Sequence, residues 1–266
     1  MKRLLLTALA ALTSVSASGA DECAALNQRF VAAKASAAEF AGMATCAARA
    51  GDKDAALTHL AAAARRGYRN AAALKDNRDF AALRNDPRWQ RSVAAIEKAE
   101  AAYKASINRE LAELFEADQA DRRPAKVDWA VVEPRDRTRH ARVKELAAAG
   151  AMKHSADFYH AAMIFQHGSK PEDYKQAQLW ALRAVDLDPN NDGARWLAAA
   201  AEDRYLHTTG KPQVWGTQYV KPQTARLFTM EPFDRSKKTD AQRIAMKVPT
   251  LAESQAKLAQ MNAGGK

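Results

Sequence analysis

The chain has 266 residues, of which 47% are hydrophobic and 27% are charged, and its formal net charge is +10 at pH 7. It contains 62 alanines but only 11 glycines and 9 prolines, a composition that favours helices over an all-β sandwich or barrel. The apolar fraction excludes a chain that is disordered as a whole. No apolar run reaches the roughly 18 residues of a membrane span. We therefore expect a mainly all-α protein that is not embedded in a membrane.

The first 20 residues have the pattern of a secretory signal peptide. Lys2 and Arg3 precede a short apolar stretch over residues 4–15, and small residues follow up to Ala20. We expect cleavage near Ala20, which leaves a periplasmic or secreted protein that starts near Asp21. Loss of the two basic residues lowers the net charge from +10 to +8.

The remaining positive charge is scattered and interleaved with acidic residues, which is typical of a solvated surface. Export argues against nucleic acid as a partner. An anionic envelope component, such as a polymer or a lipid head group, stays open as a weaker alternative.

The two cysteines, Cys23 and Cys46, both follow the expected cleavage site. Helices over 24–33 and 37–50, with a turn near 34–36, place the two cysteines side by side. Export favours a disulfide between them, which contributes roughly 3 kcal/mol. Two small buried thiols are the alternative.

Two segments carry large and small residues in the same order at helical spacing. The positions of the first copy are Phe40, Met43, Ala44, Ala47, Gly51, Asp52, Ala56, Leu60, Ala63 and Gly67. Those of the second are Phe158, Ala161, Ala162, Phe165, Asp173, Tyr174, Ala177, Ala181, Ala184 and Asp188. Over about 36–68 and 157–189 the chain resembles tetratricopeptide and Sel1-like repeats, which implies pairs of closely packed helices.

The copies are not in tandem, so we expect two compact modules, at 21–86 and 124–262, rather than a long superhelix. A stripe of apolar residues between them predicts one connecting helix over 87–123. We expect an irregular turn over 127–134 and a helix over 136–149.

The C-terminal part is expected to start with a helix near Asp192 and to continue as a loop with a short hairpin at 219–230. Two helices, at 240–246 and 251–261, and a loose tail at 263–266 then finish the chain.

Residues 108–262 resemble an uncharacterised bacterial family of unknown function. A Pro-Gln…Gly-Thr-Gln signature over 210–218 is the most specific part of the resemblance. The other matching residues are Asp118, Gln119, Arg122, Gln166, His167, Asp203, Arg204, Glu231, Pro232, Phe233, Asp234, Asp240, Arg243, Val248, Pro249, Thr250 and Leu251. The resemblance implies a shared fold and a shared polar site, and no reaction.

A polar cluster in the C-terminal module is the candidate site. Its residues are Asp118, Arg122, Asp157, His160, His167, Asp203, Arg204, Gln213, Thr217 and Gln218. We expect His167 near Arg204 or Gln218, and a ligand pocket and a buried structural network are both open. Because His160 and His167 lie about 10 Å apart along a helix, the spacing predicts no metal site.

No standard catalytic motif is present, and we expect no cofactor. Two function classes stay open: a module that binds a protein or peptide partner, and an envelope hydrolase or small-ligand-binding protein. An apolar groove favours the first class. A pocket that gathers His160, His167 and Asp203 favours the second.

Overall fold

The computed structural model describes residues 19–33, 35–222 and 225–263, where the chain forms twelve α-helices and one 3-10 helix. No strand occurs in these ranges, so the all-α prediction is confirmed. None of the described helices is long and apolar enough to cross a membrane. The expected signal peptide lies outside the described residues except for Gly19 and Ala20, and so does the expected tail except for Ala263. The chain divides into two compact units, with the boundary between Ser106 and Ile107.

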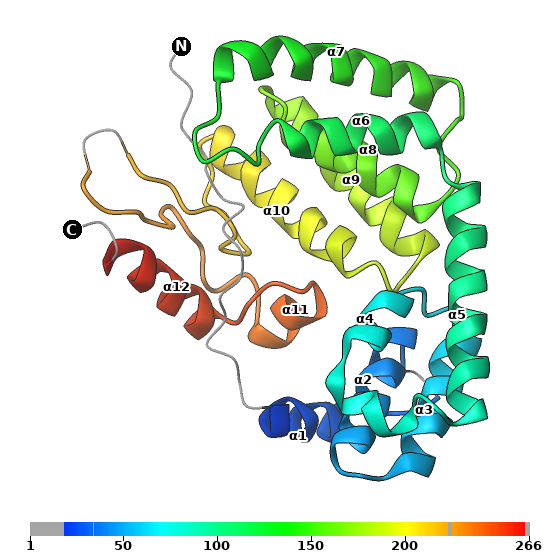
Figure 1. Ribbon diagram of the computed structural model, residues 1–266. Coiled ribbons are helices and arrows are strands. Elements are labelled where there is room, and N and C mark those ends of the chain that lie inside the picture. Colours follow the sequence, from blue (N-terminus) through cyan, green and yellow to red (C-terminus); the bar gives the residue numbers. More distant parts are fainter. Residues whose placement is uncertain (1–18, 34, 223–224, 264–266) are drawn as a thin grey trace. The chain divides into compact units, whose positions relative to one another are not determined.

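The N-terminal unit consists of five short helices and one long helix, α5 (Figure 1). They are α1 (Gly19–Arg29), α2 (Ala37–Arg49), α3 (Lys53–Arg65), α4 (Ala71–Asp76), η1 (Arg78–Leu83) and α5 (Pro87–Ser106). Helices α2 and α3 pack side by side, and α5 packs against α3. Ala44 and Ala56 are fully buried where α2 meets α3, because their small side chains allow a close approach. Gly51, with φ of 79°, makes the turn between these helices.

A disulfide joins Cys23 on α1 to Cys46 on α2, with 5.5 Å between the two Cα atoms. The predicted pairing is therefore confirmed. Helix α1 ends at Arg29, earlier than the expected end at Ala33. Arg66 holds the connecting segment instead, because its guanidinium donates to the carbonyls of Ala32 and Ala35.

The single connecting helix expected over 87–123 is wrong, because the structure has two helices there. Helix α5 ends at Ser106 and α6 runs over Arg109–Ala120. Asn108 between them is extended, and its Oδ1 accepts from the backbone N of Leu111 as an N-cap. Its own backbone N donates to Asp157 Oδ1 at 2.7 Å. The stripe of apolar residues is thus divided between two cores, with Ile96 buried in the first unit and Leu111 in the second.

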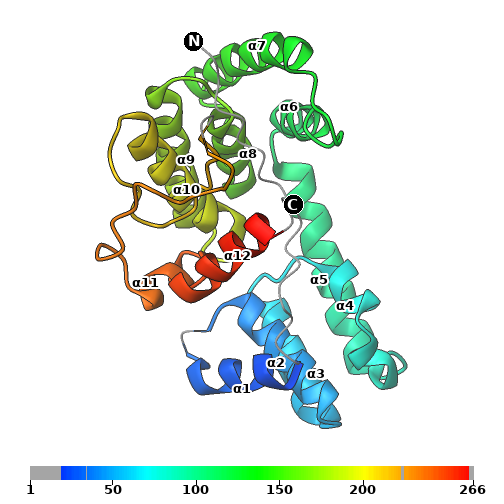
Figure 2. The same cartoon turned by 90° about the vertical axis from the view of Figure 1, so that its left-hand side faces the viewer.

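The C-terminal unit is built mainly from α-helices that pack in pairs (Figure 2). After α6 come α7 (Trp129–Ala148), α8 (Ser155–Gln166), α9 (Pro171–Leu187), α10 (Asp192–Thr208), α11 (Asp240–Ala245) and α12 (Leu251–Ala263). Helix α9 packs against both α8 and α10. The alanines of the second repeat copy, among them Ala161, Ala177 and Ala181, are fully buried between these helices.

The irregular turn expected over 127–134 is also wrong, because α7 already begins at Trp129. Asp128 caps this helix through a hydrogen bond to the backbone N of Ala130. Pro134 lies inside α7 and removes one backbone hydrogen bond. The same turn of α7 buries Val132, which is 3% exposed.

Between α10 and α11, the described residues 209–222 and 225–239 form no helix or strand and are held by side chains. The expected hairpin is reduced to one bridge, in which Val220 and Thr229 exchange two backbone hydrogen bonds of 2.8 Å. Trp215 and Val248 bury against Ala199 of α10, which anchors the segment to the helices.

Candidate functional site

Asp118 of α6 and His167, the C-terminal cap of α8, form the first part of the expected polar cluster. The Asp118 side chain is fully buried, and its Oδ2 lies 2.7 Å from His167 Nδ1. Its Oδ1 accepts from Arg122 Nη1 at 2.9 Å. Burial lowers the pKa of His167, and the hydrogen bond to Asp118 offsets part of that effect. The lowered pKa favours the neutral imidazole, in the tautomer whose Nδ1–H faces the carboxylate.

An ion-pair network extends from Asp118 to the neighbouring helix α7. Arg122 Nη2 donates to Asp136 Oδ2 at 2.7 Å, and Arg139 Nη2 donates to Asp136 Oδ1 and Asp121 Oδ2, both at 2.8 Å. Asp136 and Arg139 are each 6% exposed. The sequence reasoning missed these two, although an acid and a base three residues apart on one helix are a signal for an ion pair. The network fixes α6 against α7.

Asp157 does not join this network. Its carboxylate accepts three backbone hydrogen bonds, from Asn108 at 2.7 Å and from Lys153 and His154 at 2.9 Å each. Its side chain therefore ties the start of α8 to the start of α6. Because all three of these donors are backbone N–H groups, the carboxylate has a structural role.

His160 is also separate from the other expected site residues. Its ring stacks on Phe115, with 4.5 Å between the ring centroids. Its Nδ1 is buried and has no hydrogen-bond partner within the described ranges. Burial lowers the pKa of His160 more than the charge of Asp157 raises it. The imidazole is thus a neutral ring in a stack, and no described hydrogen bond links it to His167 or Asp203.

Asp203 of α10 organises the Gly-Thr-Gln segment. Its Oδ1 accepts from the backbone N of Val214 (2.7 Å) and Trp215 (2.9 Å). Its Oδ2 accepts from the backbone N (2.9 Å) and the hydroxyl (2.8 Å) of Thr217. Burial raises the pKa of Asp203, and these four hydrogen bonds act in the opposite direction. All four partners belong to the protein itself, so the carboxylate holds a loop.

The two expected glutamines, Gln213 and Gln218, close the same loop. Gln218 N donates to Gln213 Oε1 at 2.9 Å, and Gln213 Nε2 donates back to the carbonyl of Gln218 at 3.0 Å. Gln213 Nε2 also donates to the carbonyl of Met230. The Gln218 amide donates to the carbonyl of Ala200 and to Thr217 Oγ1. Both side chains are nearly fully buried, at 1% and 3% exposure.

Arg243 was not expected at the site, yet it is 1% exposed and braces the loop from α11. Its guanidinium donates to the carbonyls of Trp215 and Pro249 and, at 2.7 Å, to Ser254 Oγ. Burial lowers the pKa of Arg243. Its three contacts give Arg243 a structural role in holding the loop.

Arg204 links the two networks. Its Nε donates to Gln218 Oε1 at 3.3 Å, and its Nη1 donates to the carbonyl of Gln166 at 2.5 Å. Because Gln166 precedes His167, this contact places Arg204 beside the histidine, and the positive charge of Arg204 contributes to the lowered pKa of His167. Arg204 makes no ion pair among the residues that the structure describes, and its own pKa is lowered by burial.

The structure thus gathers eight of the ten expected site residues into two hydrogen-bonded networks joined by Arg204. Asp157 and His160 lie outside these networks. Within the described residues, no group of three or more His, Cys, Asp or Glu side chains is arranged to hold a metal ion. The polar atoms of the networks mostly face one another, which is the arrangement of a structural network rather than of an open site.

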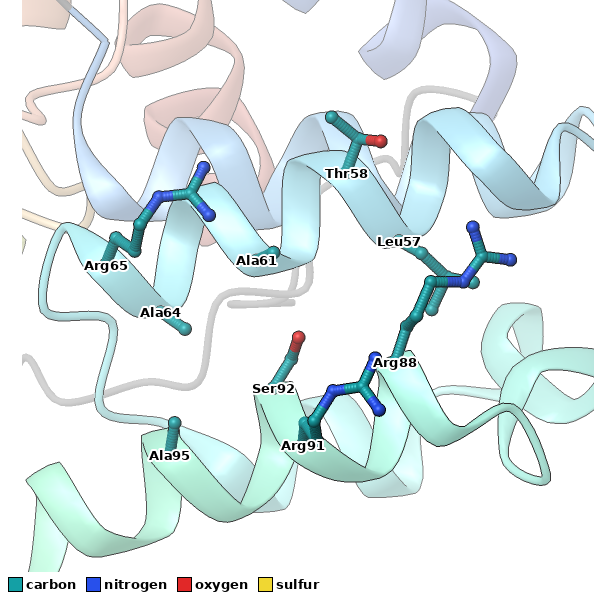
Figure 3. Close-up of a pocket in the computed structure, with 9 residues that line it drawn as sticks. All are labelled: Leu57, Thr58, Ala61, Ala64, Arg65, Arg88, Arg91, Ser92 and Ala95. Carbon is teal, nitrogen blue, oxygen red and sulfur yellow. The ribbon is translucent and has the colours of Figure 1, made fainter.

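A groove of about 470 Å³ lies in the N-terminal unit, between α3 and α5 (Figure 3). Its lining residues are Leu57, Thr58, Ala61, Ala64, Arg65, Arg88, Arg91, Ser92 and Ala95. The alanines and the leucine give it apolar walls at the level of the helix backbones. Three arginines on its two helices stand at its rim.

The three arginines differ in their partners. Arg88 Nη1 donates to Asp54 Oδ1 at 2.8 Å, and its Nη2 donates to Asp86 Oδ2 at 2.9 Å, so its charge is neutralised by the protein. The side chains of Arg65 and Arg91 have no ion-pair or hydrogen-bond partner in the described part of the chain, and both are exposed. Asp86 lies within electrostatic reach of Arg91, because its pKa is lowered first by Arg88 and to a smaller extent by the charge of Arg91. The groove therefore offers a ligand the charge of Arg65 and part of the charge of Arg91.

A second groove of about 340 Å³ lies between α4 and α5. Its charges are already paired, because Lys75 contacts Glu97 and Lys104 contacts Glu100 Oε1 at 2.5 Å. The groove between α3 and α5 is the better candidate for ligand binding.

No protein-family model, curated protein or solved structure matches this chain. The resemblances to tetratricopeptide repeats and to the uncharacterised family thus stay predictions, and the close helix–helix packing around buried alanines is compatible with the first.

Proposed function

We propose that this chain is an exported helical-repeat protein that binds a segment of a protein or peptide partner in the groove between α3 and α5. The observation that carries the proposal is the groove itself, which has apolar walls and unpaired arginines at its rim. Its volume lies within the range of small-ligand pockets, so it fits a few side chains rather than a whole helix. The resemblance to tetratricopeptide repeats supports this role, since such helix pairs present surfaces for peptides.

Two features support export. The basic start and apolar stretch of the first 20 residues have the pattern of a signal peptide. The disulfide between Cys23 and Cys46 is a bond that persists in oxidising compartments such as the periplasm. We therefore place the mature protein in the periplasm or outside the cell.

The geometry gives less support to a hydrolase in the C-terminal unit. A histidine base needs a partner that orients it and a space for substrate. His167 has the first in Asp118, but the carboxylate of Asp203 is fully occupied by the loop that it holds. His160 stacks on Phe115 and joins neither group.

A peptide library of unbiased sequence, displayed on phage and selected on the purified chain, tests the proposal. The key variant is Ala95→Trp, which fills the groove from an exposed position on α5. Its matched control is Ala94→Trp, an exposed neighbour that does not line the groove. We expect selected peptides to lose binding to the first variant and to keep it with the second. Failure to select any peptide, or equal binding to both variants, would overturn the proposed function.

A further inference from the structure

The groove between α3 and α5 contains a polar group that its helices leave unused. Ser92 is only 7% exposed, and its hydroxyl has no hydrogen-bond partner among the described residues. Figure 3 shows its side chain pointing from α5 toward α3, into the space between the helices. Its hydroxyl oxygen is open to the groove, where a ligand or water can hydrogen-bond to it. Ser92 thus provides a donor at the base of the groove.

Arg65 and Arg91 provide charge on opposite sides of that donor. Arg65 ends α3 and Arg91 lies on α5, so each of the two helices brings one positive charge to the rim of the groove (Figure 3). Arg88 at one end is different, because Asp54 and Asp86 already hold its guanidinium. A carboxylate between the two free arginines would accept charge-assisted hydrogen bonds, which are stronger than those between neutral groups.

We propose that the groove recognises an acidic peptide segment, with carboxylates held by Arg65 and Arg91 and by the hydroxyl of Ser92. This inference rests on the proposed function and adds the chemical class of the partner. Charge complementarity favours an anionic ligand. The apolar walls made by Leu57, Ala61 and Ala64 favour a peptide over a phosphate polymer, because a peptide brings aliphatic atoms that bury against them.

A labelled hexapeptide of alternating leucine and glutamate is the probe, and fluorescence anisotropy with the full chain measures its affinity. The reference peptide has glutamine in place of each glutamate. We expect the acidic peptide to bind about tenfold more tightly at low salt, with a smaller ratio at high salt because ions screen exposed charges. Equal affinity of the two peptides would overturn the inference.

Charge-reversal variants locate the binding. Arg65→Glu and Arg91→Glu should each weaken binding of the acidic peptide by about tenfold. Arg78→Glu is the matched control, because Arg78 is exposed on η1, outside the groove, and the change in net charge is the same. An equal loss in the control would show that net charge, not the groove, attracts the peptide, and would overturn the inference.

Ser92→Ala tests whether the hydroxyl acts in peptide binding or in the stability of the fold. Because the hydroxyl has no described partner, its removal should leave the melting temperature unchanged or slightly raised. The affinity for the acidic peptide should fall several-fold. Unchanged affinity for that peptide would remove Ser92 from the site and overturn the inference as stated.

Competition and the library selection distinguish the remaining outcomes. The competitors are inorganic polyphosphate and phosphatidylglycerol vesicles. Stronger competition by either of them than by unlabelled acidic peptide would show that the groove binds a polyanion or a membrane surface, and it would overturn the inference of a peptide ligand. Failure of the acidic peptide to bind, while Ala95→Trp still removes library-selected peptides, would overturn only the acidic specificity. The proposed function would then stand.

Discussion

Asp118 Oδ2 lies 2.7 Å from His167 Nδ1, although the two residues are 49 positions apart in the chain. The contact joins the C-terminal cap of α8 to the last turn of α6, and Arg122 donates to the other oxygen of the same carboxylate. A buried carboxylate that loses one partner retains an unsatisfied acceptor, so this pair decides whether the polar cluster is structural or functional.

His167→Ala should lower the free energy of unfolding by about 1–3 kcal/mol, because it leaves Asp118 Oδ2 with fewer donors in a buried position. Urea denaturation measures this change. His160→Phe is the control, since a phenyl ring keeps the stack on Phe115 and removes an unpartnered Nδ1. We expect the control to be as stable as the parent. An unchanged stability of His167→Ala would show that the cluster is not a structural network.

The unfolding free energy should depend on pH through the buried histidines. Burial lowers the pKa of His160 and His167 below the usual value of 6.5. As the pH falls below about 6.5, the unfolded chain therefore binds protons that the folded protein does not, and stability falls until the folded-state pKa is reached.

Urea titrations between about pH 7.5 and pH 5 measure this slope. The double variant His160→Phe with His167→Asn should show a shallower slope than the parent, although His59 and His207, whose pKa values are also lowered, keep part of it. An identical slope in the parent and the double variant would contradict the assignment.

The disulfide should be present in the protein isolated from cells and should stabilise the N-terminal unit. Cys23 and Cys46 close a loop with a sequence separation of 23, for which the chain-entropy model gives about 3 kcal/mol. Replacing both with serine should lower the stability of that unit by about this amount. Mass spectrometry of envelope extracts should show a start near Asp21 and no free thiol. Two free thiols or an uncleaved N-terminus would count against export.

Two buried alanines at the same repeat position test the close packing of the helix pairs. Ala56 and Ala177 are both fully buried, so Ala56→Leu or Ala177→Leu should cost about 1–3 kcal/mol through overpacking. The matched controls are Ala102→Leu on α5 and Ala141→Leu on α7, where both alanines are exposed. Thermal melting should fall for the buried sites only. Unchanged melting of both buried variants would mean that the repeat assignment is wrong.

The helices could be predicted where local patterns decide them, but their breaks depend on distant partners. The spacing of Ala56 and Leu60 predicts a helix that buries one face, and the structure has it. The break before α6 depends on Asn108, which is fixed by a hydrogen bond to Asp157, 49 positions away. A periodic pattern of apolar residues contains no information about such a contact, so the sequence indicated one continuous helix.

The candidate sites, like the ends of the helices, depend on contacts between residues that are far apart in the sequence. The sequence placed Asp118 and His167 in one cluster but gave no sign of their pairing, which the packing of α6 and α8 creates. Arg65 and Arg91 are ordinary basic residues in a chain that carries 41 lysines and arginines. Only the packing of α3 against α5 brings them to one groove, so no local pattern could single them out.

Two glycines in the loop that follows α10 have the same backbone conformation but different surroundings. Alanine substitutions at these two positions therefore distinguish the cost of backbone strain from the cost of side-chain crowding. Gly210 and Gly216 have φ of 75° and 70°, a region that L-residues adopt at a cost of roughly 1–2 kcal/mol. A Cβ at Gly210 would meet nothing within 4 Å, whereas one at Gly216 would lie 2.7 Å from the ring of Phe233. Gly210→Ala should therefore cost only the backbone strain.

Gly216→Ala should cost the same backbone strain and about 1–3 kcal/mol more, because the Phe233 ring must move away from the new methyl group. Urea denaturation of both variants measures the difference. The double variant Gly216→Ala with Phe233→Leu should recover part of the second cost, since the smaller side chain leaves room for the methyl group. Equal destabilisation by the two single variants would show that backbone strain alone requires glycine at position 216, and that the contact with Phe233 does not shape the loop.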